Sequence, residues 1–129
     1  MNLFKIIGCP LLLLLGFSCT KINGQNKLSA DGFEQLIVAT PYLQLLDVRT
    51  PQEFAESHIA EARNMDINSA DFSKKIASLD KEKPVAVYCA AGGRSGRAAA
   101  MLLEQGFKNV SDLKGGLGAW KTGQKRTVK

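Results

Sequence analysis

The sequence predicts a single α/β domain in which a parallel sheet is flanked by helices. Stretches that favour strands alternate with amphipathic helical stretches along most of the chain, as in folds built on a parallel sheet. The segment PVAVYC, from Pro84 to Cys89, is nearly all apolar and β-favouring, which is typical of a strand buried on both faces. With 129 residues, 45% of them apolar, the chain is long enough for one hydrophobic core and too short for two.

The first nineteen residues, MNLFKIIGCPLLLLLGFSC, have the pattern of an export signal, with one lysine before an apolar run. The run from Ile6 to Phe17 has twelve residues, fewer than the roughly 20 that a helix needs to cross a bilayer. The segment LGFSC resembles a bacterial lipoprotein cleavage site, which implies that Cys19 becomes a lipidated N-terminus and anchors the protein to a membrane. Ordinary secretion, with cleavage a few residues later, is the alternative. Both interpretations predict an exported protein, in the periplasm or at the cell surface.

The residues after the signal begin the domain. Thr20–Lys27 is polar and is expected to be a short tether. A helix follows up to Ala39, with Ser29 as its N-cap and an apolar face made by Phe33, Leu36 and Ile37.

The next two strands and the helix between them carry strong local signals. Tyr42–Val48 is a strand candidate, and Ala62–Ile67 contains a second, shorter one. Between them a helix begins with Thr50 as N-cap and Pro51 in the first turn, and Glu53 completes a capping box.

The second half of the chain continues the alternation. Ser69–Asp80 is an amphipathic helix, and the apolar strand that ends at Cys89 follows it. A helix is predicted over Ser95–Gln105, then a strand over Asn109–Leu113 and a last short helix over Gly116–Gly123.

Cys89 is expected to be a free thiol. Of the three cysteines, Cys9 leaves with the signal and Cys19 would be acylated, so Cys89 has no partner within the chain. Most free cysteines are small buried core residues, and this is the alternative to a reactive role. Its position decides in favour of reactivity, because ligands bind beyond the carboxyl ends of the strands in an open parallel sheet.

The loop after Cys89 has the features of an anion site. Its residues, Ala90, Ala91, Gly92 and Gly93, let successive backbone N–H groups turn inward, and a helix N-terminus follows. Arg94 adds a full positive charge, and Arg97 lies one turn further on. Because each feature favours a thiolate over a thiol, the pattern predicts a nucleophilic cysteine of lowered pKa.

Three motifs in order resemble the rhodanese family of sulfurtransferases. These are DVRTPQEFAESHIAEARNM (47–65), the loop CAAGGRS (89–95) and LKGGLGAW (113–120). The resemblance divides the chain into a signal (1–19), a tether (20–27), one domain with a five-stranded parallel sheet (28–123) and a basic tail (124–129). It implies that Cys89 accepts a sulfane sulfur as a persulfide, that Arg94 takes part, and that the loop from Ala90 through Ser95 binds the substrate.

The same resemblance implies the partners. The donor would be a small sulfur compound such as thiosulfate, and the acceptor cyanide, a thiol or a protein. No metal or organic cofactor is implied, and a monomer is expected. Phosphatases and arsenate reductases of this fold carry a longer loop, whereas four residues separate Cys89 from Arg94 here. The shorter loop suits a terminal sulfur atom and favours sulfur transfer over phosphoryl chemistry.

Charged residues near the first motif are expected to be mainly structural. Asp47 is a candidate supporting residue that could hydrogen-bond the loop, and Arg49 is expected to pair with Glu53. His58, the only histidine, is expected to tie a helix end to the next strand rather than to act as a base. Ser57 and Glu61 stand where the family commonly has glycine. The local turn is therefore expected to differ from that of its relatives.

Charge gives no support for a nucleic-acid partner. The net charge is +5, and four of the positive charges lie in the last nine residues, KTGQKRTVK, without an acid or an aromatic residue among them. We expect a solvated tail, with contact to a membrane surface or an anionic partner as the alternative. The function that remains beside an enzyme is a rhodanese module that holds sulfur or a partner without fast turnover, and the presence of both Cys89 and Arg94 favours the enzyme.

Overall fold

The computed structural model describes residues 25–129. The predicted export signal, Cys19 and the first part of the predicted tether therefore lie outside the described residues. Within 25–129, no helix is both long enough and apolar enough to pass through a lipid bilayer.

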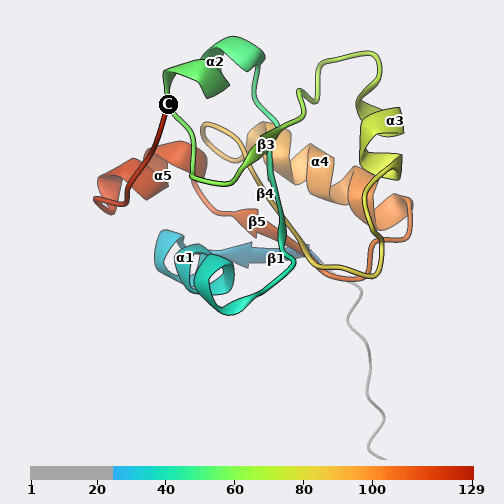
Figure 1. Cartoon of the computed structure of the whole chain (residues 1–129), viewed down its shortest axis with the longest axis horizontal. Helices are drawn as coiled ribbons and strands as arrows, with labels where there is room; N and C mark the ends of the chain where they lie inside the picture. The colour runs from blue at the N-terminus through green and yellow to red at the C-terminus, as the bar shows by residue number, and fades with distance from the viewer. Residues whose placement is uncertain (1–24) are drawn as a thin grey trace, which may run out of the picture.

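The sheet has five parallel strands in the spatial order β1-β5-β4-β2-β3, which confirms the predicted fold (Figure 1). Their bounds are β1 (Gln25–Leu28), β2 (Gln44–Asp47), β3 (Arg63–Asn64), β4 (Val85–Tyr88) and β5 (Val110–Leu113). Because β4 is the central strand, the chain leaves the middle of the sheet directly at Cys89.

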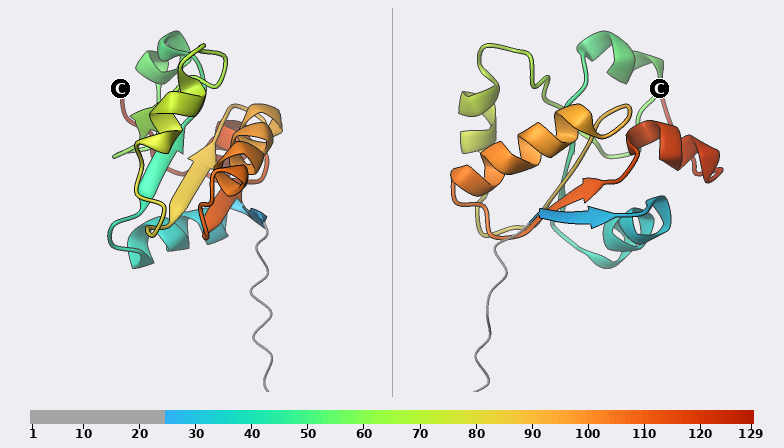
Figure 2. Two further views of the ribbon diagram at one scale, coloured as in Figure 1. Left: turned by 90° about the vertical axis from the view of Figure 1, so that its right-hand side faces the viewer. Right: turned by 180° about the vertical axis from the view of Figure 1, so that it is seen from behind.

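Helices cover both faces of this sheet (Figure 2). Side chains from α1 (Ala30–Ala39) and α5 (Gly116–Thr122) pack on one face, and side chains from α3 (Phe72–Ala77) and α4 (Gly93–Glu104) pack on the other. The short α2 (Pro51–Glu56) connects β2 to β3. The Ser29 cap of α1 and the complete capping box of Thr50 with Glu53 in α2 are both present, as the sequence predicted.

The alternation of side chains along β4 determines on which face the thiol lies. Val85, Val87 and Cys89 belong to the core under α3 and α4, whereas Ala86 and Tyr88 belong to the core under α1 and α5. Every residue of β4 is buried, as expected for a central parallel strand covered by two layers of helices. Cys89 therefore lies beneath the first turn of α4.

The tether prediction for residues 25–27 is wrong, because these residues belong to strand β1. The sequence did not indicate this strand because the segment is mostly polar. Its residues are exposed or half-buried, as in an edge strand and unlike a core strand. It pairs with β5 alone, and Gln25–Leu28 lie opposite Val110–Leu113. Backbone pairing with β5 holds this edge, and Leu28 also packs against the core under α1 and α5.

The expectation of a solvated basic tail is wrong for Lys125, whose side chain is only 9% exposed, while the other three basic residues of the tail are exposed. The ammonium group of Lys125 lies 2.8 Å from Asp31 and 3.0 Å from Glu34, both in α1. Val128 pairs with His58 as an antiparallel bridge, in which the two backbone N–H groups donate at 2.8 and 2.9 Å. Opposite charges on α1 therefore bind this part of the tail to the domain.

Candidate functional site

Cys89 lies at the carboxyl end of β4, where the sequence placed it. Its side chain is 2% exposed and belongs to the hydrophobic core under α4. Cys89 is a free cysteine in the structure. A thiol so enclosed reacts only with a group that enters the loop above it.

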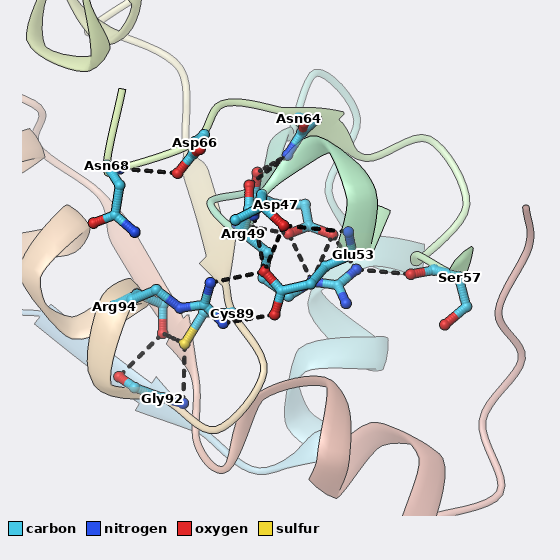
Figure 3. Close-up of polar contacts among 12 residues, drawn as sticks. Asp47, Arg49, Glu53, Ser57, Asn64, Asp66, Asn68, Cys89, Gly92 and Arg94 are labelled. Atoms are coloured by element: carbon cyan, nitrogen blue, oxygen red, sulfur yellow. Dashed lines mark hydrogen bonds and ion pairs between the residues drawn. The ribbon is translucent and has the colours of Figure 1, made fainter. Parts of the chain in front are cut away.

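The loop after Cys89 directs a backbone N–H group at the sulfur (Figure 3). The N–H of Gly92 donates to Sγ of Cys89 at 3.0 Å. Gly92 adopts a φ of +111° and is the N-cap of α4, a conformation that a side chain would strain. This turn brings the helix N-terminus to the sulfur, where its partial positive charge favours an anion.

Ser95 places a hydroxyl group against the same sulfur. Its Oγ lies 3.4 Å from Sγ of Cys89 and donates to the carbonyl oxygen of Gly92 at 3.2 Å. The side chain of Ser95 is fully buried in the first turn of α4. The serine is thus a hydrogen-bonding partner of the sulfur that water cannot replace.

The pKa of the Cys89 thiol results from two opposed effects. Burial raises it, because the charged form loses hydration. Hydrogen bonds from the Ser95 side chain and from the backbone of Ser95, Gly92 and Ala91 lower it, and the net pKa is below the ordinary value. The loop therefore favours the thiolate through fixed hydrogen-bond donors.

Arg94 directs its guanidinium group to Glu53 in α2 (Figure 3). Its Nη1 and Nη2 donate to the two carboxylate oxygens of Glu53 at 2.8 and 2.9 Å. The hydrogen bond from Arg94 lowers the pKa of Glu53 to about 2, and the pKa of Arg94 rises in turn. The positive charge that the sequence assigned to the anion site is therefore paired with a carboxylate.

The predicted pair of Arg49 with Glu53 is wrong. Arg49 binds Asp47 instead, with Nη2 2.6 Å from Oδ2 and Nε 2.9 Å from Oδ1, and it also donates to the carbonyl of Ser57. Asp47 is fully buried at the end of β2, and such a charge is costly unless a cation neutralises it. Arg49 is the nearest cation in sequence, so Glu53 is left for Arg94.

The two candidate supporting residues do not join the loop. Asp47 accepts hydrogen bonds from Arg49, and within residues 25–129 it makes none to the loop after Cys89. Arg97 is exposed on α4 and has no ion pair among the described residues. His58 stacks on Phe54 and its Nδ1 is 2.8 Å from the Phe54 carbonyl, so it is structural, as expected.

Helix α5 supports the loop after Cys89, and little in the sequence predicts this contact. The N–H groups of Leu117 and Gly118 donate to the carbonyl oxygens of Cys89 and Ala90 at 2.8 and 3.0 Å. A Cβ atom on Gly116 would lie 2.5 Å from the Cys89 carbonyl oxygen, so only glycine fits there. The start of α5 thus supports the loop after Cys89, while Trp120 packs in the core at 4% exposure.

The described residues contain no cluster of histidine, cysteine, aspartate or glutamate suited to a metal ion. The chemistry of the site is that of one buried sulfur, three backbone donors and one hydroxyl group. Such a set stabilises negative charge on a sulfur atom or on a small anion beside it.

Comparison with known proteins agrees with this geometry. The model of the rhodanese-like domain matches residues 29–122. A protein named sulfurtransferase from Allochromatium vinosum is 32% identical over 95 residues, which are 74% of this chain and 87% of that protein. The thiosulfate sulfurtransferase GlpE of Pseudomonas aeruginosa is 42% identical over 80 residues, which are 61% of this chain and 70% of that protein.

Solved structures show the same fold. A rhodanese-related protein from Thermoplasma volcanium superposes with a TM-score of 0.70 at 29% identity, covering 80% of this chain and 97% of that protein. The rhodanese-like domain of the Anabaena protein Alr3790 gives the same TM-score at 33% identity, covering 79% of this chain and 77% of the compared chain. The chain therefore belongs to the family of proteins with a rhodanese-like domain.

Proposed function

We propose that this protein is a sulfurtransferase that carries a sulfane sulfur on Cys89 as a persulfide. The observation that carries the proposal is the environment of Sγ, which the Gly92 N–H and the Ser95 hydroxyl contact within a four-residue loop. The names of its relatives support the same class of reaction. Thiosulfate is the donor that we propose, by analogy with GlpE.

The first half-reaction loads the cysteine. The Cys89 thiolate attacks the outer sulfur of thiosulfate, a bond forms between the two sulfurs, and the sulfur–sulfur bond of thiosulfate breaks. Sulfite leaves with the electron pair, and the new terminal sulfur of the persulfide carries the negative charge. The inward N–H groups of the loop and the N-terminus of α4 stabilise this charge.

The second half-reaction removes the terminal sulfur from Cys89. A nucleophilic acceptor, such as cyanide or a thiolate, attacks the terminal sulfur and forms a new bond to it. The bond between Sγ and the terminal sulfur breaks, and its electron pair returns to Cys89 as the thiolate. Dividing one transfer into two steps lets the same set of donors serve both.

The pairing of Arg94 with Glu53 bears on how the donor is recruited. Because the guanidinium is neutralised by two hydrogen bonds, the loop offers no free side-chain charge from residues 89–94. A dianion such as thiosulfate would then be attracted by backbone donors and by the helix dipole. Such a site also accepts donors of lower charge, such as small persulfides.

A test of the proposal separates loading from turnover. The domain is incubated with thiosulfate and its mass is measured, and thiocyanate formation is followed after cyanide is added. We expect wild-type protein to gain one sulfur atom and to turn over, and Cys89→Ser to do neither. Loading without turnover would indicate a carrier module, and an equal mass gain in Cys89→Ser would refute the assignment of Cys89.

We further propose that the protein is exported and anchored to a membrane through a lipid on Cys19. The support is the short apolar run that ends at the segment LGFSC. Cells grown with a fatty-acid probe should label the wild-type protein and not Cys19→Ala. Equal labelling of both proteins would refute the lipid anchor, and secretion without labelling would favour the ordinary signal.

A further inference from the structure

A cavity of about 390 Å³ lies between α1, α5, the loop from α2 to β3 and the C-terminal tail. The tail forms one side of it, because the chain runs from the end of α5 back toward α2 (Figure 1). The apolar residues that line the cavity are Ile37, Val38, Ile59, Ala60, Trp120 and Val128. The core residues among them belong to the core under α1 and α5, whereas Cys89 belongs to the core on the other face of the sheet.

Arg126 supplies the unpaired charge of this lining. The two charged residues that line the cavity are Glu34 and Arg126. Glu34 binds the ammonium group of Lys125 at 3.0 Å, whereas Arg126 is exposed and forms no ion pair within residues 25–129. The carbonyl oxygen of Arg126 accepts a hydrogen bond from Nε1 of Trp120 at 2.9 Å, so the indole contributes apolar surface and no free donor. A ligand would therefore meet apolar side chains and one uncompensated cation.

The size and exposure of the cavity suit a small molecule. Val38 at its edge is 82% exposed although its side chain is large and apolar, so a ligand would cover surface that water contacts unfavourably. Sites for small molecules are typically apolar cavities of roughly 300–1,000 Å³ with a few polar groups. An apolar cavity of about 150 Å³ holds a benzene ring, so this one has room for roughly 10–15 non-hydrogen atoms.

We propose that this cavity binds a small monoanion with an apolar body, of the class of medium-chain carboxylic acids. The hydrocarbon chain packs on Ile37, Ile59 and Trp120, and the carboxylate binds the guanidinium group of Arg126. A cation of the same shape finds no free partner, because Glu34 is already bound to Lys125. The site goes beyond the proposed function and does not depend on it.

The fluorescence of the purified protein reports on this cavity directly, because Trp120 is the only tryptophan in the chain. Titration with octanoate, octan-1-ol and octylammonium at one ionic strength compares three head groups on the same hydrocarbon chain. We expect octanoate to give a saturable change with a Kd of about 0.1–1 mM. Octan-1-ol should bind about threefold to tenfold more weakly, since a partly exposed ion pair adds only that much, and octylammonium should bind most weakly. Excess thiosulfate should not displace octanoate.

Two variants test the two parts of the site. Arg126→Gln keeps the backbone carbonyl that binds Trp120 and removes the charge, so octanoate should bind it only as tightly as octan-1-ol does. Arg97→Gln is the matched control, because Arg97 is an exposed arginine of α4, on the other face of the sheet, and it should bind octanoate as wild type does. Ala60→Phe fills the cavity from an exposed position, so all three probes should lose their saturable response.

Methyl NMR spectra provide a second measurement if the fluorescence does not respond. Octanoate should shift the methyl signals of Ile37, Ile59 and Val128, which line the cavity. No saturable change in either measurement would overturn the proposal, as would equal affinity for the three probes or tightest binding of octylammonium. Binding to vesicles of anionic lipid without any response to octanoate would assign this face to a membrane surface and also overturn it. Because these measurements do not require sulfur transfer, failure of this inference is distinguishable from failure to form the persulfide.

Discussion

Arg94 in the first turn of α4 binds Glu53 in α2 through both carboxylate oxygens, at 2.8 and 2.9 Å (Figure 3). Glu53 has a second task, since its Oε2 also accepts from the backbone N–H of Thr50 at 2.9 Å and closes the capping box of α2. One carboxylate thus connects the start of α2 to the start of α4, the helix that follows Cys89. Because Glu53 binds both Thr50 and Arg94, a change at Glu53 should affect the binding of a sulfur donor and the stability of the fold.

Glu53→Gln should improve the use of thiosulfate. The amide keeps hydrogen-bonding capacity and removes the charge that neutralises Arg94, so the guanidinium becomes available to a dianion. We expect KM for thiosulfate to fall by about threefold to tenfold at low ionic strength, because a partly exposed charge interaction is worth on the order of 1 kcal/mol. Steady-state kinetics at low and high salt measure it, since screening should remove the gain.

The matched control is Glu82→Gln. Glu82 forms an exposed pair with Lys108 and does not contact Arg94. Its KM should equal that of wild type at both salt concentrations. If Glu53→Gln left KM unchanged or raised it, pairing with Glu53 would not be what limits the attraction of the donor.

Acid should weaken the link between α2 and the loop. The pKa of Glu53 is about 2 in the folded protein and 4.5 ordinarily, so its ionised form stabilises the fold above pH 4.5. This contribution is lost as the pH falls from 4.5 toward 2. The difference in Tm between wild type and Glu53→Gln should therefore shrink in this window, with solvent screening limiting its size because Glu53 is 32% exposed. Thermal denaturation across that range measures it, and a constant difference would contradict the shift.

Gly116→Ala should damage both the fold and the site. Its φ is +59°, and an added Cβ would lie 2.5 Å from backbone atoms of Cys89 and Ala90, which cannot move aside without displacing the loop. We expect a loss of about 2 kcal/mol or more in the free energy of unfolding and a lower rate of sulfur transfer. Gly32→Ala in α1 is the control, since its nearest contact is 3.4 Å to the Ser29 hydroxyl. Equal denaturation midpoints in the two variants would show that α5 does not hold the loop.

Glu61→Gly should stabilise the protein. Glu61 has a φ of +70°, a conformation that costs a residue with a side chain roughly 1–2 kcal/mol, while glycine adds an entropy cost of about 0.5–1 kcal/mol. We expect a net gain of about 0.5–1 kcal/mol in urea denaturation. Ser57→Gly is the matched control, because Ser57 is extended with a φ of −167° and should only lose stability. A lower midpoint for Glu61→Gly would show that its side chain compensates for the strain.

Insertion of one glycine after Gly92 should separate the sulfur from its donors. The Gly92 N–H lies 3.0 Å from Sγ, and a displacement of about 1 Å costs on the order of 100-fold in rate. We expect kcat/KM for sulfur transfer to fall by about 100-fold. The same insertion after Lys81, in the exposed turn before β4, should leave it near the wild-type value. Unchanged activity in the longer loop would mean that loop length does not select sulfur transfer.

Elements with a strong local or apolar signal were predictable from the sequence. The fully apolar β4 could only be a buried strand, and the caps at Ser29 and Thr50 act through hydrogen bonds to residues three positions away. Helix α4 begins at Gly93, two residues before the predicted start, because Gly92 adopts the left-handed conformation that caps it. A Cβ atom on Gly92 would lie 3.6 Å from the backbone nitrogen of Gly115.

Strand β1 could not be read from composition. Three of its four residues are polar, and the segment forms a strand because β5 offers its backbone groups along the edge of the sheet. The position of Lys125 in the tail could not be predicted either. It reaches Asp31 and Glu34 only because α1 and α5 pack on the same face of the sheet.

The sequence by itself determined the order of the elements after β1 and the place of Cys89 at the carboxyl end of a buried strand. These follow from apolar patterning and from short-range hydrogen bonds, which act between neighbours along the chain. Tertiary structure alone decided which charges pair. Glu53 pairs with Arg94, and Arg49 pairs with Asp47. Ion pairs depend on distances of a few ångströms between side chains, and only the packed sheet and helices fix those distances.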